Sequence, residues 1–184
     1  PREGGGLGAH APARAQAAMA VLRAQPSGAR AQRPRREPGP LATGAKRGYT
    51  SSIAVYIDQS GSVDQASLEL AFAELRNLAR HTEFTTYHFD TEVDKASEKV
   101  WKKGKTPPAY RTRSGGTCFD CVTTHANKNR KRFDGYIIIT DGEASMPKAS
   151  KVKRCWLIVP GRKLAFTPSK RDYVAKMKKA NKIS

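Results

Sequence analysis

The chain has 184 residues, enough for one ordinary domain with an appendage, and carries 34 Lys and Arg against 16 Asp and Glu, a net charge of +18. No apolar run approaches the roughly 18 residues of a membrane-spanning helix, so we expect no transmembrane segment. Three cysteines fit a reducing compartment better than a disulfide-bonded secreted scaffold, which favours a cytoplasmic protein.

Residues 1–48 differ in composition from the rest of the chain. They are rich in Ala, Gly, Pro and Arg, contain no aromatic residue, and carry nine Arg and Lys against two Glu. Such a segment buries too little apolar surface to offset its chain entropy, so we expect a disordered or extended basic arm. Its helix-forming residues allow one short Ala-rich helix around Ala13–Arg23.

Residues 49–184 contain every aromatic residue and alternate β-prone runs with helical patterns. The apolar runs predict strands at Ser52–Ile57, Phe84–Phe89, Gly135–Thr140 and Arg154–Val159, with a weaker polar strand at Val93–Trp101. The helical spacing predicts helices at Asp64–Arg80, Cys118–Lys131 and Pro168–Ala180. Strands that alternate with helices predict an α/β domain with a Rossmann-like, mostly parallel sheet flanked by helices.

Three polar motifs follow or precede these predicted elements. The first strand runs into Asp58-Gln59-Ser60-Gly61-Ser62, the middle helix is preceded by Ser114-Gly115-Gly116-Thr117, and the fourth strand ends in Thr140-Asp141-Gly142. Functional groups collect at the carboxyl ends of the strands in such sheets. We therefore expect five side chains around one point: Asp58, Ser60, Ser62, Thr117 and Asp141.

The chemistry of this set predicts a metal site. It offers only hydroxyl and carboxylate oxygens, hard donors that favour Mg²⁺, Mn²⁺ or Ca²⁺ over zinc or copper. Two carboxylates balance one divalent cation without a surplus of anionic ligands, so the cation stays electrophilic. An open position on it would then accept a carboxylate from a partner protein.

The motif Asp58-x-Ser60-x-Ser62, followed by Thr117 and Asp141, resembles the metal-ion-dependent adhesion site (MIDAS) of von Willebrand factor type A (VWA) domains. More narrowly, IDQSGSV, SGGTCFD and IITDGEA resemble the VWA-like domain that follows a metallopeptidase region in bacterial and phage proteins. The resemblance covers about residues 50–160. It implies a bound Mg²⁺ or Mn²⁺, coordinated directly by the serine and threonine hydroxyls and directly or through water by the two aspartates.

The same resemblance implies a Mg²⁺-dependent protein-binding module that recognises an Asp or Glu of a partner, in the cytoplasm or in a phage particle. Two departures matter. Cys118 stands where related domains often carry an acidic residue, and none of the four histidines belongs to a His-Glu-x-x-His zinc motif. We therefore expect no enzyme, although a non-catalytic part of a metallopeptidase-like system stays an alternative.

Cys118-x-x-Cys121 offers a rival chemistry, because its spacing matches dithiol redox motifs or half a zinc site. The third cysteine, Cys155, falls inside a predicted strand, and two small residues packing a helix against the sheet are the simpler interpretation. His88 is expected to be a half-buried sheet residue, and His125, one turn past Cys121 on the predicted helix, supports the zinc interpretation only slightly. Asp90, at the end of the second strand, is a candidate to support the metal site from behind.

The basic excess suggests a further class of partner. Residues 151–184 hold eleven Lys and Arg against Asp172 alone, and the arm adds to this charge. We expect nonspecific contact with nucleic acid through the basic arm and the predicted C-terminal helix. The alternative function is a basic scaffold of a virion or nucleoprotein, with a structural or vestigial metal site. No nucleic-acid recognition motif stands out in the sequence.

Overall fold

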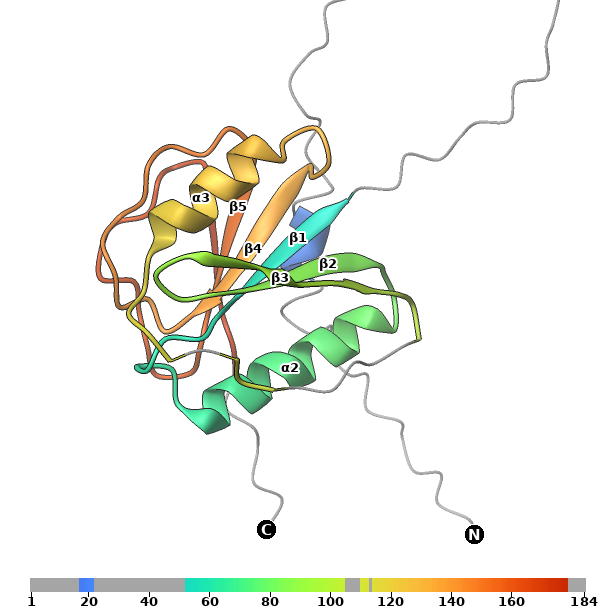
Figure 1. The fold of residues 1–184 in the computed structure, drawn as a ribbon, viewed down its shortest axis with the longest axis horizontal. Coiled ribbons are helices and arrows are strands. Elements are labelled where there is room, and N and C mark those ends of the chain that lie inside the picture. The colour runs from blue at the N-terminus through green and yellow to red at the C-terminus, as the bar shows by residue number, and fades with distance from the viewer. Residues whose placement is uncertain (1–16, 22–51, 105–109, 113, 179–184) are drawn as a thin grey trace, which may run out of the picture.

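The computed structural model describes residues 17–21, 52–104, 110–112 and 114–178. Their core is a six-stranded sheet in the order β3-β2-β1-β4-β5-β6 (Figure 1). The strands are β1 (Ile53–Asp58), β2 (Phe84–Phe89), β3 (Val93–Trp101), β4 (Gly135–Thr140), β5 (Lys153–Ile158) and β6 (Tyr173–Lys176). Only β2 and β3 pair antiparallel, and the other neighbours are parallel. The predicted mostly parallel α/β sheet is confirmed.

Helix α2 (Gln65–Ala79) covers one face of the sheet, which we call the α2 face. It begins after Asp64, whose carboxylate accepts a hydrogen bond from the Ser67 backbone N–H at 2.6 Å and so satisfies one free donor of the first turn. The predicted stripe is buried against the sheet: Leu68, Ala71, Phe72, Leu75 and Leu78. The spacing of three and four residues therefore builds the first half of the core.

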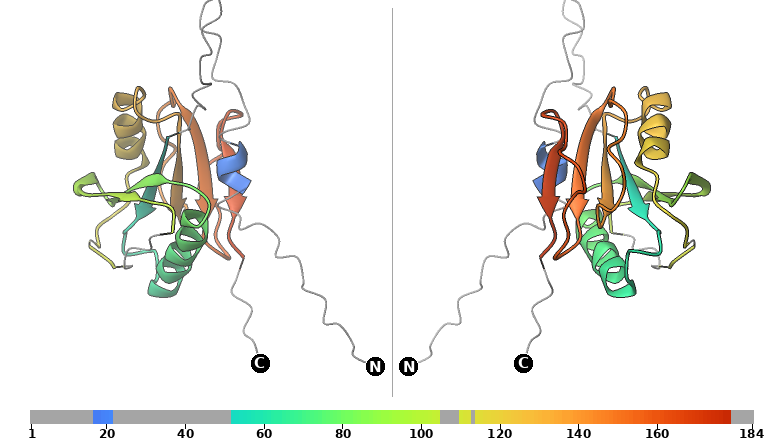
Figure 2. Two further views of the ribbon diagram at one scale, coloured as in Figure 1. Left: turned by 90° about the vertical axis from the view of Figure 1, so that its right-hand side faces the viewer. Right: turned by 90° about the vertical axis from the view of Figure 1, so that its left-hand side faces the viewer.

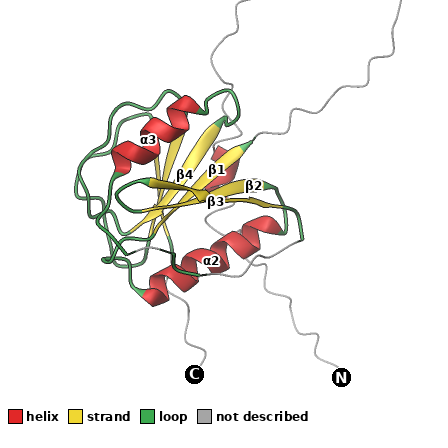
Figure 3. Cartoon of the chain, in the orientation of Figure 1, coloured by secondary structure: helices red, strands yellow, loops and turns green. Residues whose placement is uncertain are grey.

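Helix α3 (Phe119–Lys128) lies on the opposite side of the sheet, which we call the α3 face (Figures 2 and 3). Here the buried side chains are mostly rings. Tyr56 stacks on Tyr87 with ring centroids 5.4 Å apart, and Phe119 meets Trp156 edge-on at 5.0 Å. Such offset and edge-to-face pairs are the arrangements that aromatic rings prefer.

Residues 17–21 form a helical segment beside β6 (Figure 2). This segment falls within the helix predicted at Ala13–Arg23, and the rest of the predicted arm lies outside the described residues. Ala18 and Met19 are buried in the same apolar cluster as α2. The described connections 141–152 and 159–172 contain no helix, so this segment contributes to the cover of the sheet where a crossover helix would otherwise pack. None of the described helices is long and apolar enough to cross a membrane.

The predicted helix at Pro168–Ala180 is wrong over its described part. Residues Tyr173–Lys176 form β6, which pairs parallel with β5. The Lys and Ala content favours a helix locally, but tertiary contacts decide otherwise. The Met177 backbone N–H donates to the Ile158 carbonyl at 2.8 Å, and alternate side chains of β6 face inward. The helix through which we expected contact with nucleic acid is therefore absent from the described part of this region.

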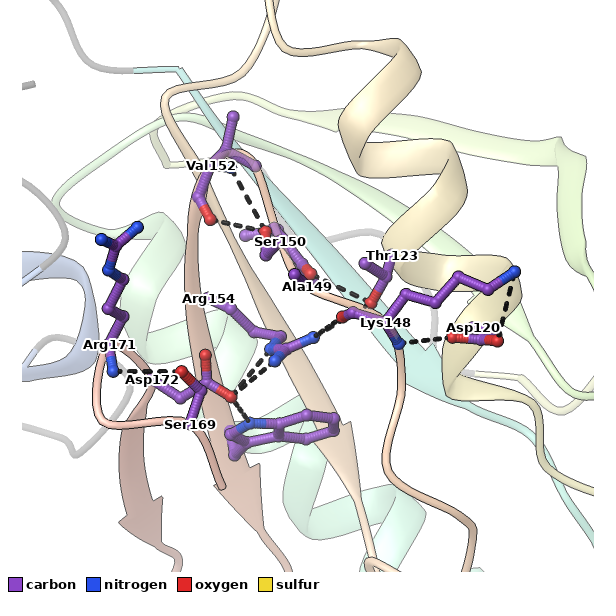
Figure 4. A network of polar contacts seen from close by, with 12 residues as sticks. Asp120, Thr123, Lys148, Ala149, Ser150, Val152, Arg154, Ser169, Arg171 and Asp172 are labelled. Atoms are coloured by element: carbon purple, nitrogen blue, oxygen red, sulfur yellow. Dashed lines mark hydrogen bonds and ion pairs between the residues drawn. The ribbon is translucent and has the colours of Figure 1, made fainter. Parts of the chain in front are cut away.

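A buried polar network fixes the approach to β6 (Figure 4). Asp172 is held by Arg154 of β5, with Nη2 at 2.8 Å and Nε at 2.9 Å, and by the Trp156 indole N–H at 3.0 Å. The guanidinium also donates to Thr123 of α3 and to the Lys148 carbonyl, both at 3.2 Å. This ion pair thus joins β5, α3 and two loops. It holds the residue that precedes β6 in place and so stabilises the position of the last strand.

Candidate metal-binding site

The candidate site lies at the carboxyl ends of β1 and β4, two neighbouring central strands. The chain leaves β1 toward β2 on one side and leaves β4 toward β5 on the other, so the strand order reverses between them. The loops that follow these strands gather at one edge of the sheet (Figure 1). Open α/β sheets bind ligands at such a switch point, and the predicted motifs fall there.

Asp58 ends β1 and is 1% exposed. Its Oδ1 accepts the Ser60 backbone N–H at 2.9 Å, and its Oδ2 accepts the Thr140 hydroxyl at 2.6 Å. Burial raises the pKa of Asp58 above its usual value, and the negative charge of Asp141 adds to the rise. Thr140 in turn accepts the Gly142 backbone N–H at 3.0 Å, so Asp58 is tied to the loop that follows β4.

Asp141 is equally buried, at 1% exposure. Its Oδ1 accepts the Glu143 backbone N–H at 3.2 Å, whereas its Oδ2 has no hydrogen-bond partner among the residues that the structure describes. Among the described residues, neither Asp141 nor Asp58 forms an ion pair with a Lys or Arg. A buried carboxylate oxygen without a partner is costly, and two neighbouring ones repel each other. A cation between these groups would remove both penalties.

The hydroxyls lie on two adjoining loops. Ser60 is buried and Ser62 exposed, and their Oγ atoms are 3.2 Å apart. Thr117 is half-buried on the loop before α3, which is joined to the first loop by the Gly61 N–H donating to the Gly115 carbonyl at 3.0 Å. Hydrogen bonds thus connect Ser60 with Asp58 and with Ser62, and electrostatic repulsion couples Asp141 to Asp58. Thr117 is linked to this group only through the backbone hydrogen bond between the two loops.

Asp90 and Gly115 fix how close the second loop approaches. The Asp90 carbonyl accepts the Cys118 backbone N–H at 2.8 Å, directly beyond Thr117. A Cβ atom on Gly115 would lie 2.8 Å from Oδ2 of Asp90, so only glycine fits there without a shift. Asp90 therefore contacts the loop that carries Thr117, and its support of a metal site stays a prediction.

Sequence reasoning missed Arg111, which braces the first loop. Its guanidinium donates to the carbonyl oxygens of Gln59 and Ser60, both at 3.1 Å, and to that of Val63. The Thr112 N–H adds a bond to Oε1 of Gln59 at 3.1 Å. No local pattern in a loop rich in Lys, Pro and Gly marks Arg111. Thr140, also missed, had a signal: a hydroxyl that ends an otherwise apolar strand.

The donor set fits a small hard cation. Within the described ranges, no three His, Cys, Asp or Glu side chains gather as metal ligands would, so any ligand set here must include the hydroxyls. Two buried carboxylates with adjacent hydroxyls suit Mg²⁺ or Mn²⁺, which keep water and accept neutral oxygens. The unpartnered Oδ2 of Asp141 is the atom that most needs such a ligand.

Both thiols form hydrogen bonds within the first turn of α3. Cys118 caps α3, its Sγ accepting the Cys121 N–H at 3.3 Å, and the Cys121 thiol donates to the Cys118 carbonyl at 2.8 Å. Burial raises the pKa of the Cys121 thiol, the opposite of an activated nucleophile. Cys155 lies buried in the α2-face cluster, whereas Cys121 packs against the α3-face cluster. The sheet therefore separates the third thiol from the pair.

His88 is buried, whereas the sequence suggested a half-buried residue, and His125 is half-buried. His88 Nδ1 is 2.9 Å from the Thr112 hydroxyl, and His125 Nδ1 is 2.8 Å from the Tyr56 hydroxyl. Burial lowers the pKa of both imidazoles and so favours their neutral forms. Each ring nitrogen at these contacts serves a hydrogen bond within the fold.

Comparison with known proteins agrees with this architecture. The family model described as "VWA-like domain (DUF2201)" matches residues 53–171, more than half of the chain. Among solved structures, the ArnB paralog VWA2 from Sulfolobus acidocaldarius aligns with a TM-score of 0.45 and 18% sequence identity, over 59% of this chain and 34% of that chain. The present chain thus spans about a third of that one. A search of curated protein sequences found no match.

Proposed function

The chain belongs to the VWA-like domain (DUF2201) family, and from this premise we propose that it is a Mg²⁺- or Mn²⁺-dependent protein-binding module. VWA-like domains typically mediate protein interactions and often bind divalent cations. In this proposal the metal is held by Asp58, Ser60, Ser62, Thr117 and Asp141. The partner supplies the carboxylate of an Asp or Glu.

The observation that carries the proposal is the unpartnered, buried Oδ2 of Asp141. It lies near a second buried carboxyl group, that of Asp58, whose pKa is raised by burial and by the Asp141 charge. Two neighbouring buried carboxylates repel each other, and a buried carboxylate oxygen without a hydrogen-bond partner costs stability. A bound cation is the simplest compensation, and the neighbouring serine hydroxyls are donors it accepts.

Each residue has a separate task in this mechanism. Thr140 and the Ser60 N–H orient Asp58 so that its lone pairs are fixed. Arg111 holds the carbonyls of the first loop and so sets the direction of the serine hydroxyls. When bound, the cation supplies Lewis acidity toward an incoming carboxylate. Because the two carboxylates only balance the charge of the cation and the other three donors are neutral, the cation would stay electrophilic toward that carboxylate.

We also propose that the domain performs no catalysis. The two thiols and two histidines considered as rival chemistry are occupied by hydrogen bonds of the fold. The raised pKa of Cys121 disfavours a thiolate nucleophile. The five proposed ligands include no imidazole or amine that would act as a base near neutral pH.

The test is thermal unfolding of the full chain in EDTA, Mg²⁺ and Mn²⁺, with Asp141→Asn and Thr117→Ala beside the wild type. At a metal concentration one hundred times Kd, linkage predicts about 2.7 kcal/mol of stabilisation. That corresponds to a rise in Tm of roughly 5–10 °C for a domain of this size. Both variants should lose the rise. Glu83→Gln, which removes an exposed carboxylate that is not among the proposed ligands, should keep the rise in Tm.

The Asp141→Asn variant also makes a prediction of opposite sign in EDTA. Without metal, replacing a buried charged group by a neutral amide should leave the protein as stable as the wild type or more stable. A metal response that survives in Asp141→Asn would contradict the assignment of the ligands. A wild type that responds to neither ion would contradict the proposal itself.

The partner side of the proposal is tested with displayed random peptides selected in Mg²⁺ and eluted with EDTA. We expect the eluted peptides to be enriched in Asp or Glu, because a carboxylate would complete the coordination of the cation. Selection of peptides without acidic residues, or elution that ignores EDTA, would contradict recognition through the metal.

A further inference from the structure

A basic pocket lies at the other end of α3 from the candidate metal site. It has a volume of about 400 Å³ and is lined by Thr124, Asn127, Lys128, Arg130, Lys131 and Lys151. Four of these six side chains are cationic, and none is acidic or aromatic. Helix α3 begins after the loop of Thr117 and ends near the start of β4 (Figure 1). The pocket, lined by residues at and after the carboxyl end of α3, therefore lies away from the candidate metal site.

Asn127 builds this pocket by joining its two walls. One wall is the last turn of α3 and the turn after it, and the other is the loop before β5. The Asn127 side chain donates to the Ala149 carbonyl at 3.3 Å and accepts the Lys151 backbone N–H at 2.7 Å. These bonds hold Lys151 opposite Lys128 and Lys131. The concavity is therefore set by the fold and does not depend on the long side chains alone.

The positive charge of the pocket is not compensated within the described residues. Lys128, Arg130, Lys131 and Lys151 are exposed and form no ion pair there. The neighbouring cations Arg132 and Lys148 do have partners, Glu98 and Asp120. The carboxyl end of α3 accommodates one or two cations through its dipole, but four in one hollow exceed what a single helix end needs.

We propose that this pocket binds the phosphate backbone of a nucleic acid. Ammonium and guanidinium groups neutralise phosphates and release their counterions, and the exposed Thr124 hydroxyl is a further donor. The lining offers no ring on which a base could stack, so contact is with the backbone and independent of sequence. The net charge of +18 gives the long-range attraction, and the pocket gives it a place on the folded domain.

The test uses fluorescence anisotropy of a short, labelled single-stranded DNA oligomer titrated with the full chain over a series of salt concentrations. The triple variant Lys128→Ala/Lys131→Ala/Lys151→Ala should bind at least about tenfold more weakly, and its salt slope should fall by about 2, since each phosphate contact contributes about 0.7. The variant with three arginines at these positions should bind as the wild type does. EDTA should leave binding unchanged.

The matched control is Lys95→Ala/Lys99→Ala/Lys102→Ala, which removes the same charge from exposed positions in and just after β3. It should lose much less affinity than the pocket variant. Equal losses in the two triple variants would overturn the proposal, because charge alone would then explain binding. No binding by the wild type, or competition by polyglutamate as strong as by unlabelled DNA, would also overturn it. Unchanged Tm values confirm that each variant is folded.

Discussion

The two faces of the sheet are packed by different kinds of side chain. On the α2 face the cluster is mainly aliphatic, with Leu68, Leu75 and Leu78 of the helix over Ile53 and Val55 of β1. On the α3 face the cluster is mainly aromatic, and buried or partly buried polar contacts accompany it: Tyr56 with His125, Tyr87 with Glu98, Thr123 with Tyr136, and Arg154 with Asp172.

This difference determines how each face responds to substitution. Aliphatic contacts are lost in proportion to the volume removed. A ring hydroxyl, an indole N–H or a guanidinium in the core needs a specific partner, and losing that partner leaves an uncompensated group. The loop of Thr117 precedes α3 and the basic pocket lies at the other end of this helix, so contacts on the α3 face help to position part of each proposed site.

The largest effect should follow from breaking the buried ion pair of the α3 face. In Asp172→Ala, Arg154 would stay buried without its carboxylate, and the Trp156 N–H would lose its acceptor. We expect the free energy of unfolding to fall by about 3–5 kcal/mol, measured by urea denaturation followed by circular dichroism. The loss of β6 pairing would appear as fast hydrogen exchange at the Met177 amide.

An exposed pair is the control for that experiment. Arg162 and Glu143 contact each other with about half of each side chain exposed. Glu143→Ala should cost less than about 1 kcal/mol, because water screens the pair and replaces its hydrogen bonds. Similar costs for the two substitutions would refute the special role of buried polar contacts on the α3 face.

A smaller effect is expected on the α2 face, at the segment 17–21. Met19→Ala should lower the free energy of unfolding by about 2 kcal/mol, the lower end of the range for a buried methionine, because this short segment can settle into the space. Leu75→Ala in α2 provides the reference for the same face, at about 2–5 kcal/mol.

Ala20→Ser is the matched control for Met19→Ala, since Ala20 is exposed in the same segment. It should leave the urea midpoint nearly unchanged. If Met19→Ala is as silent as Ala20→Ser while Leu75→Ala destabilises, the segment does not contribute to the core.

The predicted elements succeeded where local pattern and tertiary packing agree. Three predicted strands have the observed bounds: Phe84–Phe89, Val93–Trp101 and Gly135–Thr140. Their residues favour an extended chain locally, and the sheet pairs them as strands. The region after Pro168 failed because its Lys and Ala residues favour a helix locally. The ion pair of Asp172 and the pairing with β5 are long-range contacts that no local pattern reveals.

The candidate site shows the same division. The positions of Asp58, Ser60 and Asp141 follow from their places at strand ends, and the parallel register of β1 and β4 brings those ends together. The contacts of Arg111 could not be predicted, since they join a loop to backbone carbonyls some 50 residues earlier in the chain. The basic pocket likewise depends on Asn127 bridging α3 to a distant loop.

The smallest effect concerns Arg111, which braces the first loop of the candidate site. Arg111 binds the loop between β1 and α2 through the carbonyls of Gln59, Ser60 and Val63. In Arg111→Ala the serine hydroxyls lose this support, and we expect about tenfold weaker Mg²⁺ binding, as for other groups that orient metal ligands. Calorimetric titration of Mg²⁺ measures this loss, and Arg80→Ala, at an exposed position after α2, is the control. Because Arg111 contacts backbone only, a residual metal response should remain, whereas Asp141→Asn should abolish it. Unchanged Mg²⁺ affinity in Arg111→Ala would show that Asp58 and Thr140 fix the loop without Arg111. The polar contacts that matter for metal binding would then be confined to the α3 face.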